Sequence, residues 1–246
     1  MPDRMEQLSG LPAPVQRYLA FAGVDPLRPI VAMHATQSGT LRADVRATRW
    51  YAFAATHEVA LPDRMFSWHA RVRLLGPLGL HVHDGLHHGE GYGEVALGKH
   101  LRIAQAHGGA MNSAALLRYL AEAIWYPSAL LPEAGVTWAP LDAHSARASL
   151  TVGESRVALQ FFFAGSGEVT RVYAPARARK DGKHFVDTPW EANLADYRTQ
   201  QGLTVPWRAQ VGWWIDGALQ PVWRGSLDAV EWQFSSPMRG DTLGDH

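Results

Sequence analysis

The stretch SAALLRYLAEAIWY, residues 113–126, decides the fold that we expect. Its apolar side chains recur at helical spacing and cover most of the circumference of a helix. Asn112 or Ser113 can cap the first turn, and Pro127 ends the helix because proline cannot continue the backbone hydrogen bonds. A helix from Ser113 to Tyr126 that is this apolar must be covered by other elements. We therefore expect it to lie inside the molecule.

The segments on both sides of this helix predict strands. An N-terminal helical segment is expected over residues 1–24, but from Ile30 the apolar period changes to two. Phe66, Trp68, Ala70 and Val72, for example, alternate with polar residues, which is typical of a half-buried strand. The expected strands are 30–41, 49–61, 65–75, 78–84 and one through 103, followed by 136–138, 146–152, 157–163, 169–178, 203–215 and 223–234.

These elements predict a mainly β (α+β) fold. We expect a strongly curved antiparallel sheet, or half-barrel, wrapped over the central helix, with a further helix at the N-terminus. A closed barrel and a split into two domains are the alternatives. The expected organisation is a single domain over residues 1–246, with a flexible tail at 238–246.

The composition excludes several classes of function. Lys+Arg and Asp+Glu number 23 each, so no overall field favours nucleic acid. The chain has no cysteine, which excludes disulfides and thiolate metal sites. No secretory signal or membrane-spanning run is visible, so the cytoplasm is the expected location. There is no P-loop, Gly-x-Ser-x-Gly or His-Glu-x-x-His motif, and we expect no cofactor.

Two carboxylates are candidate catalytic groups. Asp84 lies between Val82 and a glycine-rich bend, where an apolar cavity would raise its pKa toward that of a general acid or base. The competing interpretation is an aspartate that caps a turn. Glu122 follows Arg118 by one helical turn, which predicts either a structural ion pair or a functional carboxylate. Tyr126 is a third catalytic candidate, since it could donate a hydrogen bond to a substrate oxygen.

The ten tryptophans favour an aromatic-lined pocket. The residues that we expect to contact a ligand are Trp68, Tyr92, Arg118, Tyr119, Trp125 and Trp190. His57 and His69 are single histidines on strands, and we expect them to face solvent.

A histidine cluster offers a metal-binding alternative. His81 and His83 point to the same face of a strand, and His87 follows beyond them. Imidazoles in this arrangement can ligate zinc or another transition metal. The competing interpretation is a polar, partly exposed bend.

Several segments together resemble a bacterial protein family of unknown function. They are LPAPVQRYL (11–19), FSWHA (66–70), Asp84 ahead of GEGYG (89–93), LRYLAEAIWYPSALLP (117–132), Pro189-Trp190 and GLTVP (202–206). That family is similar in architecture to the LolA-like lipoprotein carriers, half-barrels in which a curved antiparallel sheet wraps helices around an apolar cavity. The resemblance implies a hydrophobic ligand site and no particular reaction.

Three functions are therefore open. The first is acid/base catalysis by Asp84 and Glu122 on a bound hydrophobic small molecule, giving an isomerase, cyclase, lyase or hydrolase. The second is a carrier of such a molecule without chemistry. The third is a metal-dependent enzyme that uses His81, His83 and His87.

Overall fold

The computed structural model describes residues 8–74, 79–98, 101–182 and 184–236. Within these ranges thirteen strands form one sheet in the order β6-β5-β4-β3-β2-β1-β13-β12-β11-β10-β9-β8-β7. The strands of the first half are β1 (Ile30–Leu41), β2 (Tyr51–Ala60), β3 (Met65–Arg73), β4 (Gly79–His87), β5 (Glu90–Leu97) and β6 (Leu101–Ala106). Those of the second half are β7 (Thr137–Asp142), β8 (Ser145–Val152), β9 (Ser155–Phe163), β10 (Val169–Asp181), β11 (His184–Gln200), β12 (Leu203–Ile215) and β13 (Ala218–Phe234).

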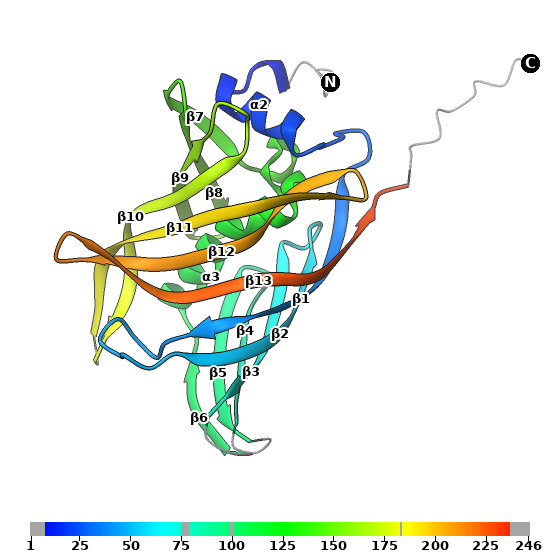
Figure 1. The fold of residues 1–246 in the computed structure, drawn as a ribbon. Helices are drawn as coiled ribbons and strands as arrows, with labels where there is room; N and C mark the ends of the chain where they lie inside the picture. Colours follow the sequence, from blue (N-terminus) through cyan, green and yellow to red (C-terminus); the bar gives the residue numbers. More distant parts are fainter. Residues whose placement is uncertain (1–7, 75–78, 99–100, 183, 237–246) are drawn as a thin grey trace, which may run out of the picture.

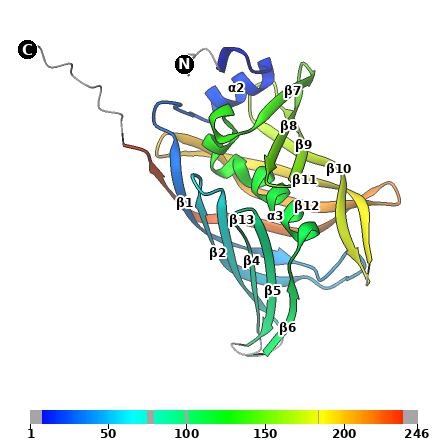
Figure 2. The same cartoon turned by 180° about the vertical axis from the view of Figure 1, so that it is seen from behind.

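The sheet is strongly curved, and the helix α3 (Gly109–Glu122) lies against its inner face (Figures 1 and 2). Each neighbouring strand pair is antiparallel, and the pairing of β1 with β13 joins the two halves of the sheet. Between the edge strands β6 and β7 the chain passes through α3 and three short 3₁₀ turns. With the N-terminal helix α2 (Ala13–Phe21), this confirms the expected half-barrel over a central helix. The single domain stays a prediction, and residues 238–246 lie outside the described ranges.

The central helix has different ends from those expected. It begins at Gly109, and its N-cap is Gly108 without a side-chain cap. The predicted cap by Asn112 or Ser113 was wrong. The Asn112 Oδ1 atom accepts a hydrogen bond from the Gly91 backbone N–H at 2.9 Å, and the Ser113 hydroxyl donates to that of Ser155 at 3.4 Å. The α-helix ends at Glu122 and tightens into 3₁₀ turns, η1 (Ala123–Trp125), η2 (Pro127–Leu130) and η3 (Pro132–Ala134). Pro127 therefore begins a turn just after the helical segment ends.

The period-two pattern located most strands but missed β11. Residues His184 to Asp187 of β11 are all exposed, so they show no alternation between a buried and a polar face. Pro189 further weakens the strand pattern, because proline has no N–H to donate to a neighbouring strand. In the structure Pro189 lies opposite an irregularity of β10, where the pairing shifts between Ala174 and Arg177. The last strand expected before the central helix is divided into β5 and β6.

Buried side chains of α3 and η1 form the centre of the hydrophobic core. Leu116, Leu120 and Ile124 are each exposed by 2 % or less. They pack within one cluster that includes residues from both halves of the sheet. Among the described residues, no helix is both long enough and apolar enough to cross a membrane.

A candidate ligand cavity with buried charges

A partly open cavity of about 760 Å³ lies between the C-terminal end of α3 and the inner face of the sheet. Its walls are mostly apolar, with Trp68, Leu80 and Val82 from β3 and β4, Trp125 from η1, and Trp190, Leu194 and Trp213 from β11 and β12. The exposed residues Ala43, Asp44 and Lys180 also line it and mark its opening to solvent. The cavity has the size and character of a small-molecule site.

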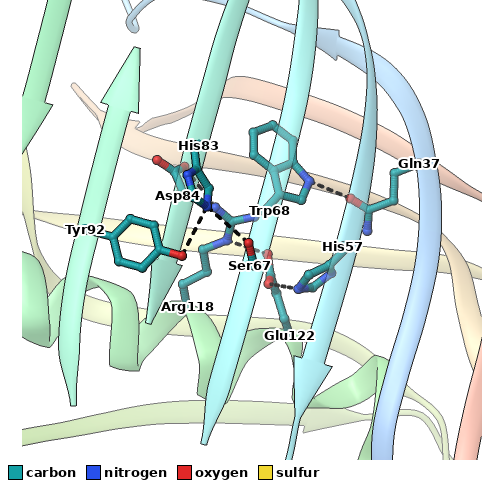
Figure 3. Close-up of polar contacts among 9 residues, drawn as sticks. All are labelled: Gln37, His57, Ser67, Trp68, His83, Asp84, Tyr92, Arg118 and Glu122. Carbon is teal, nitrogen blue, oxygen red and sulfur yellow. Dashed lines mark hydrogen bonds and ion pairs between the residues drawn. The ribbon is translucent and has the colours of Figure 1, made fainter. Parts of the chain in front are cut away.

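Arg118 is the centre of the charged groups in this cavity (Figure 3). Its Nε atom donates to Oε1 of Glu122 at 2.8 Å, and its Nη1 atom donates to Oδ2 of Asp84 at 3.0 Å. The guanidinium also lies about 5 Å from the ring centroids of Phe66 (5.1 Å) and Trp68 (5.0 Å). Burial, the largest single influence, lowers the pKa of Arg118, but the two carboxylates together raise it above its ordinary value. Arg118 is therefore a permanent cation that holds two carboxylates.

His57 extends this network into the core. It is fully buried on β2, and its Nε2 atom lies 3.4 Å from Oε2 of Glu122. Burial lowers the pKa of His57 to about 4, against the opposing attraction of Glu122, and Arg118 lowers it further. The imidazole is consequently neutral at pH 7. Neither ring nitrogen makes a hydrogen bond of good geometry to any described residue.

Asp84 combines a raised pKa with access to the cavity. Burial raises its pKa, with a smaller contribution from Glu122, and the positive charges of Arg118 and Arg177 oppose this rise. Its side chain retains 32 % exposure, and Asp84 lines the cavity. A carboxyl group with a raised pKa that a ligand can reach is suited to general acid/base catalysis.

Arg177 is a second cation in the cavity. Its guanidinium carbon lies 4.8 Å from the ring centroid of Trp190 and 5.6 Å from that of Trp213. Burial lowers its pKa to about 10, with a further contribution from the positive charge of Arg118, so it stays protonated at neutral pH. No described residue makes a hydrogen bond or an ion pair to this guanidinium, in contrast to Arg118.

A β-bulge brings Arg177 into the cavity. Ala174 pairs with Trp190 and Arg177 pairs with Thr188, so β10 has one residue more than β11 between these pairs. Directly before the bulge, Val172 and Ala174 of β10 are buried. Simple alternation from these would place residue 177 on the outer face, but the extra residue returns it to the inner face.

The structure brings six of the nine predicted catalytic and ligand-binding residues together. Asp84, Glu122, Arg118, Trp68, Trp125 and Trp190 all line the cavity. The other three, Tyr92, Tyr119 and Tyr126, are not among the lining residues. The Tyr126 hydroxyl donates to the Tyr119 carbonyl oxygen at 2.8 Å, and both side chains are buried. Tyr92 is bound to His83 through a 3.1 Å contact between its hydroxyl and the His83 Nε2 atom.

The histidines proposed as metal ligands lie on β4, whose residues Leu80, Val82 and Asp84 face the cavity. His81 and His83 alternate with these residues and so point to the opposite face of the strand. The His83 ring stacks on His69, with centroids 3.6 Å apart. Within the described ranges, no group of three or more His, Asp or Glu side chains is arranged to hold a metal ion. The metal site of His81, His83 and His87 therefore stays a prediction without a ligand set.

Two residues of the site were missed by the sequence reasoning. The expectation that His57 faces solvent was wrong, because it belongs to the buried face of β2 with Phe53, Ala55 and Val59. Its alternation with exposed residues could have revealed this position. The sequence around Arg177 has no such alternation that would place this residue inside, because the bulge changes which residues of β10 face inward.

Comparisons with curated proteins and solved structures give no activity. No curated protein matches the chain. Similar solved structures include a LolA superfamily protein from Nitrosomonas europaea, with 9 % identity, a TM-score of 0.44, and coverage of 89 % of this chain and 93 % of that one. Another is a β-barrel-like protein of domain of unknown function DUF1849 from Brucella abortus, with 12 % identity and a TM-score of 0.24, covering 83 % of this chain and 99 % of that one.

The family comparison covers most of the sequence. Residues 3–225 match the family of unknown function DUF6544, which confirms the resemblance that the sequence segments indicated. The chain belongs to this family.

Proposed function

We propose that this protein binds a hydrophobic small molecule in the cavity beside α3. The observation that carries the proposal is the cavity itself, about 760 Å³ with tryptophan, leucine and valine side chains on its walls. Small-molecule sites have volumes of roughly 300–1,000 Å³, with mostly apolar walls and a few polar groups that fix orientation. Here Asp84, Glu122, Arg118 and Arg177 supply those polar groups.

A neutral apolar dye tests this proposal directly. We expect 1-N-phenylnaphthylamine to bind with a rise in its fluorescence, and Ala192→Phe to abolish the rise by filling the cavity. Ala192 lines the cavity, whereas Ala195 on the same strand β11 is exposed. Ala195→Phe is therefore the matched control and should bind the dye like the unchanged protein. Equal dye binding by both variants, with both folded, would remove the support for this cavity as the binding site.

Acid/base catalysis on the bound molecule is the second candidate function. It is favoured by Asp84, whose pKa is raised by burial and whose side chain remains accessible from the cavity. Asp84→Asn keeps the shape of the side chain and removes its ability to exchange a proton. We expect this variant to bind lipophiles and to lose any conversion of them.

Mass spectrometry of a lipophile incubated with each protein provides the measurement. The lipophile is the one extracted from the purified protein, added back to ligand-free samples. New products with the unchanged protein, and none with Asp84→Asn or Glu122→Gln, support catalysis. Recovery of the same molecule unaltered from all three proteins supports a binding protein without chemistry.

A further inference from the structure

Arg177 has an unusual combination of properties for a charged residue in an apolar cavity. Both aromatic partners, Trp190 and Trp213, hold its guanidinium by cation–π contacts, and all three residues line the cavity. None of the described carboxylates forms an ion pair with it. A cation removed from bulk water without a counter-ion is costly, so an anion that entered the cavity would gain a strong interaction.

Asp84 and Glu122 attract Arg177 from a distance and oppose the lowering of its pKa by burial, but neither forms an ion pair with it. Asp84 and Glu122 are both bound to Arg118, at 3.0 and 2.8 Å. Arg179 on the same strand is paired differently, since its Nη2 atom lies 3.6 Å from Oδ2 of Asp181. The third carboxylate that lines the cavity, Asp44, accepts hydrogen bonds from the backbone N–H groups of Arg46 and Ala47.

The overall charge of the cavity also favours an anion. Its lining contains five cationic residues and three acidic ones, which leaves a formal excess of two positive charges. The cations are Arg42, Arg118, Arg177, Arg179 and Lys180, and the acids are Asp44, Asp84 and Glu122. Lys180 is exposed at the opening, where it can attract an anionic ligand from solution.

The Arg177 guanidinium has donors that suit a carboxylate. Its central carbon lies 4.8 Å from the Trp190 ring centroid, and its N–H groups donate to no described residue, so they are available to a ligand. Two parallel N–H donors match the two oxygens of a carboxylate. We propose that the cavity takes an amphiphile with one carboxylate, such as a fatty acid, with the carboxylate on Arg177 and the chain along the apolar walls. This inference rests on the proposed function and names the class of its ligand.

Three probes of equal chain length test the inference on the unchanged protein. Dodecanoate, dodecanol and dodecylamine are compared at pH 8 by displacement of 1-N-phenylnaphthylamine. We expect dodecanoate to bind about tenfold or more tightly than dodecanol, because a hydrogen-bonded ion pair is added to the same apolar contact. The amine should bind most weakly, because its charge is repelled by Arg177.

Substitution of Arg177 tests whether this residue causes the preference for dodecanoate over dodecanol. Arg177→Gln should lower the affinity for dodecanoate about tenfold relative to that for dodecanol, so that acid and alcohol bind alike. Arg224→Gln is the matched control: Arg224 also stacks on a tryptophan, 4.6 Å from the Trp50 centroid, but it is exposed and does not line the cavity. The Arg224→Gln variant should prefer dodecanoate over dodecanol as strongly as the unchanged protein does.

The outcomes separate this inference from the proposed function. If neither the dye nor any probe binds, the proposed function fails. If dodecanol or dodecylamine binds the unchanged protein as tightly as dodecanoate, hydrophobic binding stands and the carboxylate inference is overturned. If the acid is preferred equally by Arg177→Gln, the assignment of Arg177 is overturned. The comparison on the unchanged protein remains decisive should Arg177→Gln fail to fold.

Discussion

His57 and Glu122 face each other across the interior, with Nε2 of the imidazole 3.4 Å from Oε2 of the carboxylate. The second oxygen of Glu122 accepts from Nε of Arg118 at 2.8 Å. Glu122 thus lies between a permanent cation and a histidine that burial keeps neutral. Protonation of His57 would place a new positive charge in a fully buried site.

The first prediction concerns acid sensitivity. The pKa of His57 is about 4 in the folded protein against 6.5 as its ordinary value. Between these values the unfolded chain binds a proton that the folded chain does not, so this group makes stability fall as pH falls from 6.5 to 4. The loss is on the order of 3 kcal/mol in the free energy of unfolding. His57→Gln should remove it.

Urea unfolding at pH 7.0, 5.5 and 4.5 measures this effect. The pH dependence of the unchanged protein should be steeper than that of His57→Gln over this range. His144→Gln is the control, because His144 is exposed. If His57→Gln and the unchanged protein lose stability in parallel, His57 is not the residue responsible.

The second prediction concerns Arg118. Arg118→Met keeps much of the apolar stem and leaves Asp84 and Glu122 without their shared cation. Removing one partner of a buried charge network destabilises strongly, and we expect about 3 kcal/mol in the free energy of unfolding. Adding Asp84→Asn and Glu122→Gln to this variant should recover part of the loss, since the uncompensated charges are then gone.

Denaturant unfolding provides this measurement, with Arg198→Met as the comparison. Arg198 pairs with Asp196 at 2.7 Å on the exposed surface, where such pairs contribute little. Its loss should change stability far less than the loss of Arg118. Similar costs for the two arginines, or a further loss in the triple variant, would contradict a buried charge network centred on Arg118.

The central helix and the alternating strands could be predicted from the sequence because local patterns determine them. The apolar circumference of residues 113–126 required a surrounding sheet, and the buried residues Phe66, Trp68, Ala70 and Val72 of β3 follow the expected period of two. The same alternation placed Trp68 on the inner face, where it now lines the cavity. Asp84 and Glu122 were identified individually, but their common partner Arg118 depends on how β4 packs against α3.

The rest of the site depends on non-local geometry. Arg177 faces inward only because β10 has an extra residue opposite Pro189 of β11. A strand pattern read from β10 alone has no means of detecting this bulge. Tyr126, in contrast to Arg177, was predicted as a site residue but does not line the cavity. Its hydroxyl instead donates to the Tyr119 carbonyl oxygen.

The last prediction separates this structural role of Tyr126 from a catalytic one. Its buried hydroxyl donates to the Tyr119 carbonyl oxygen at 2.8 Å, and it does not line the cavity. Tyr126→Phe should therefore lower the free energy of unfolding by about 1 kcal/mol, the net contribution of one hydrogen bond, and leave dye binding unchanged. Tyr18→Phe is the control, because the buried Tyr18 hydroxyl has no hydrogen-bond partner among the described residues. Its removal should cost nothing, since no bond is broken. A loss of ligand binding or conversion by Tyr126→Phe at unchanged stability would instead place this hydroxyl at the ligand.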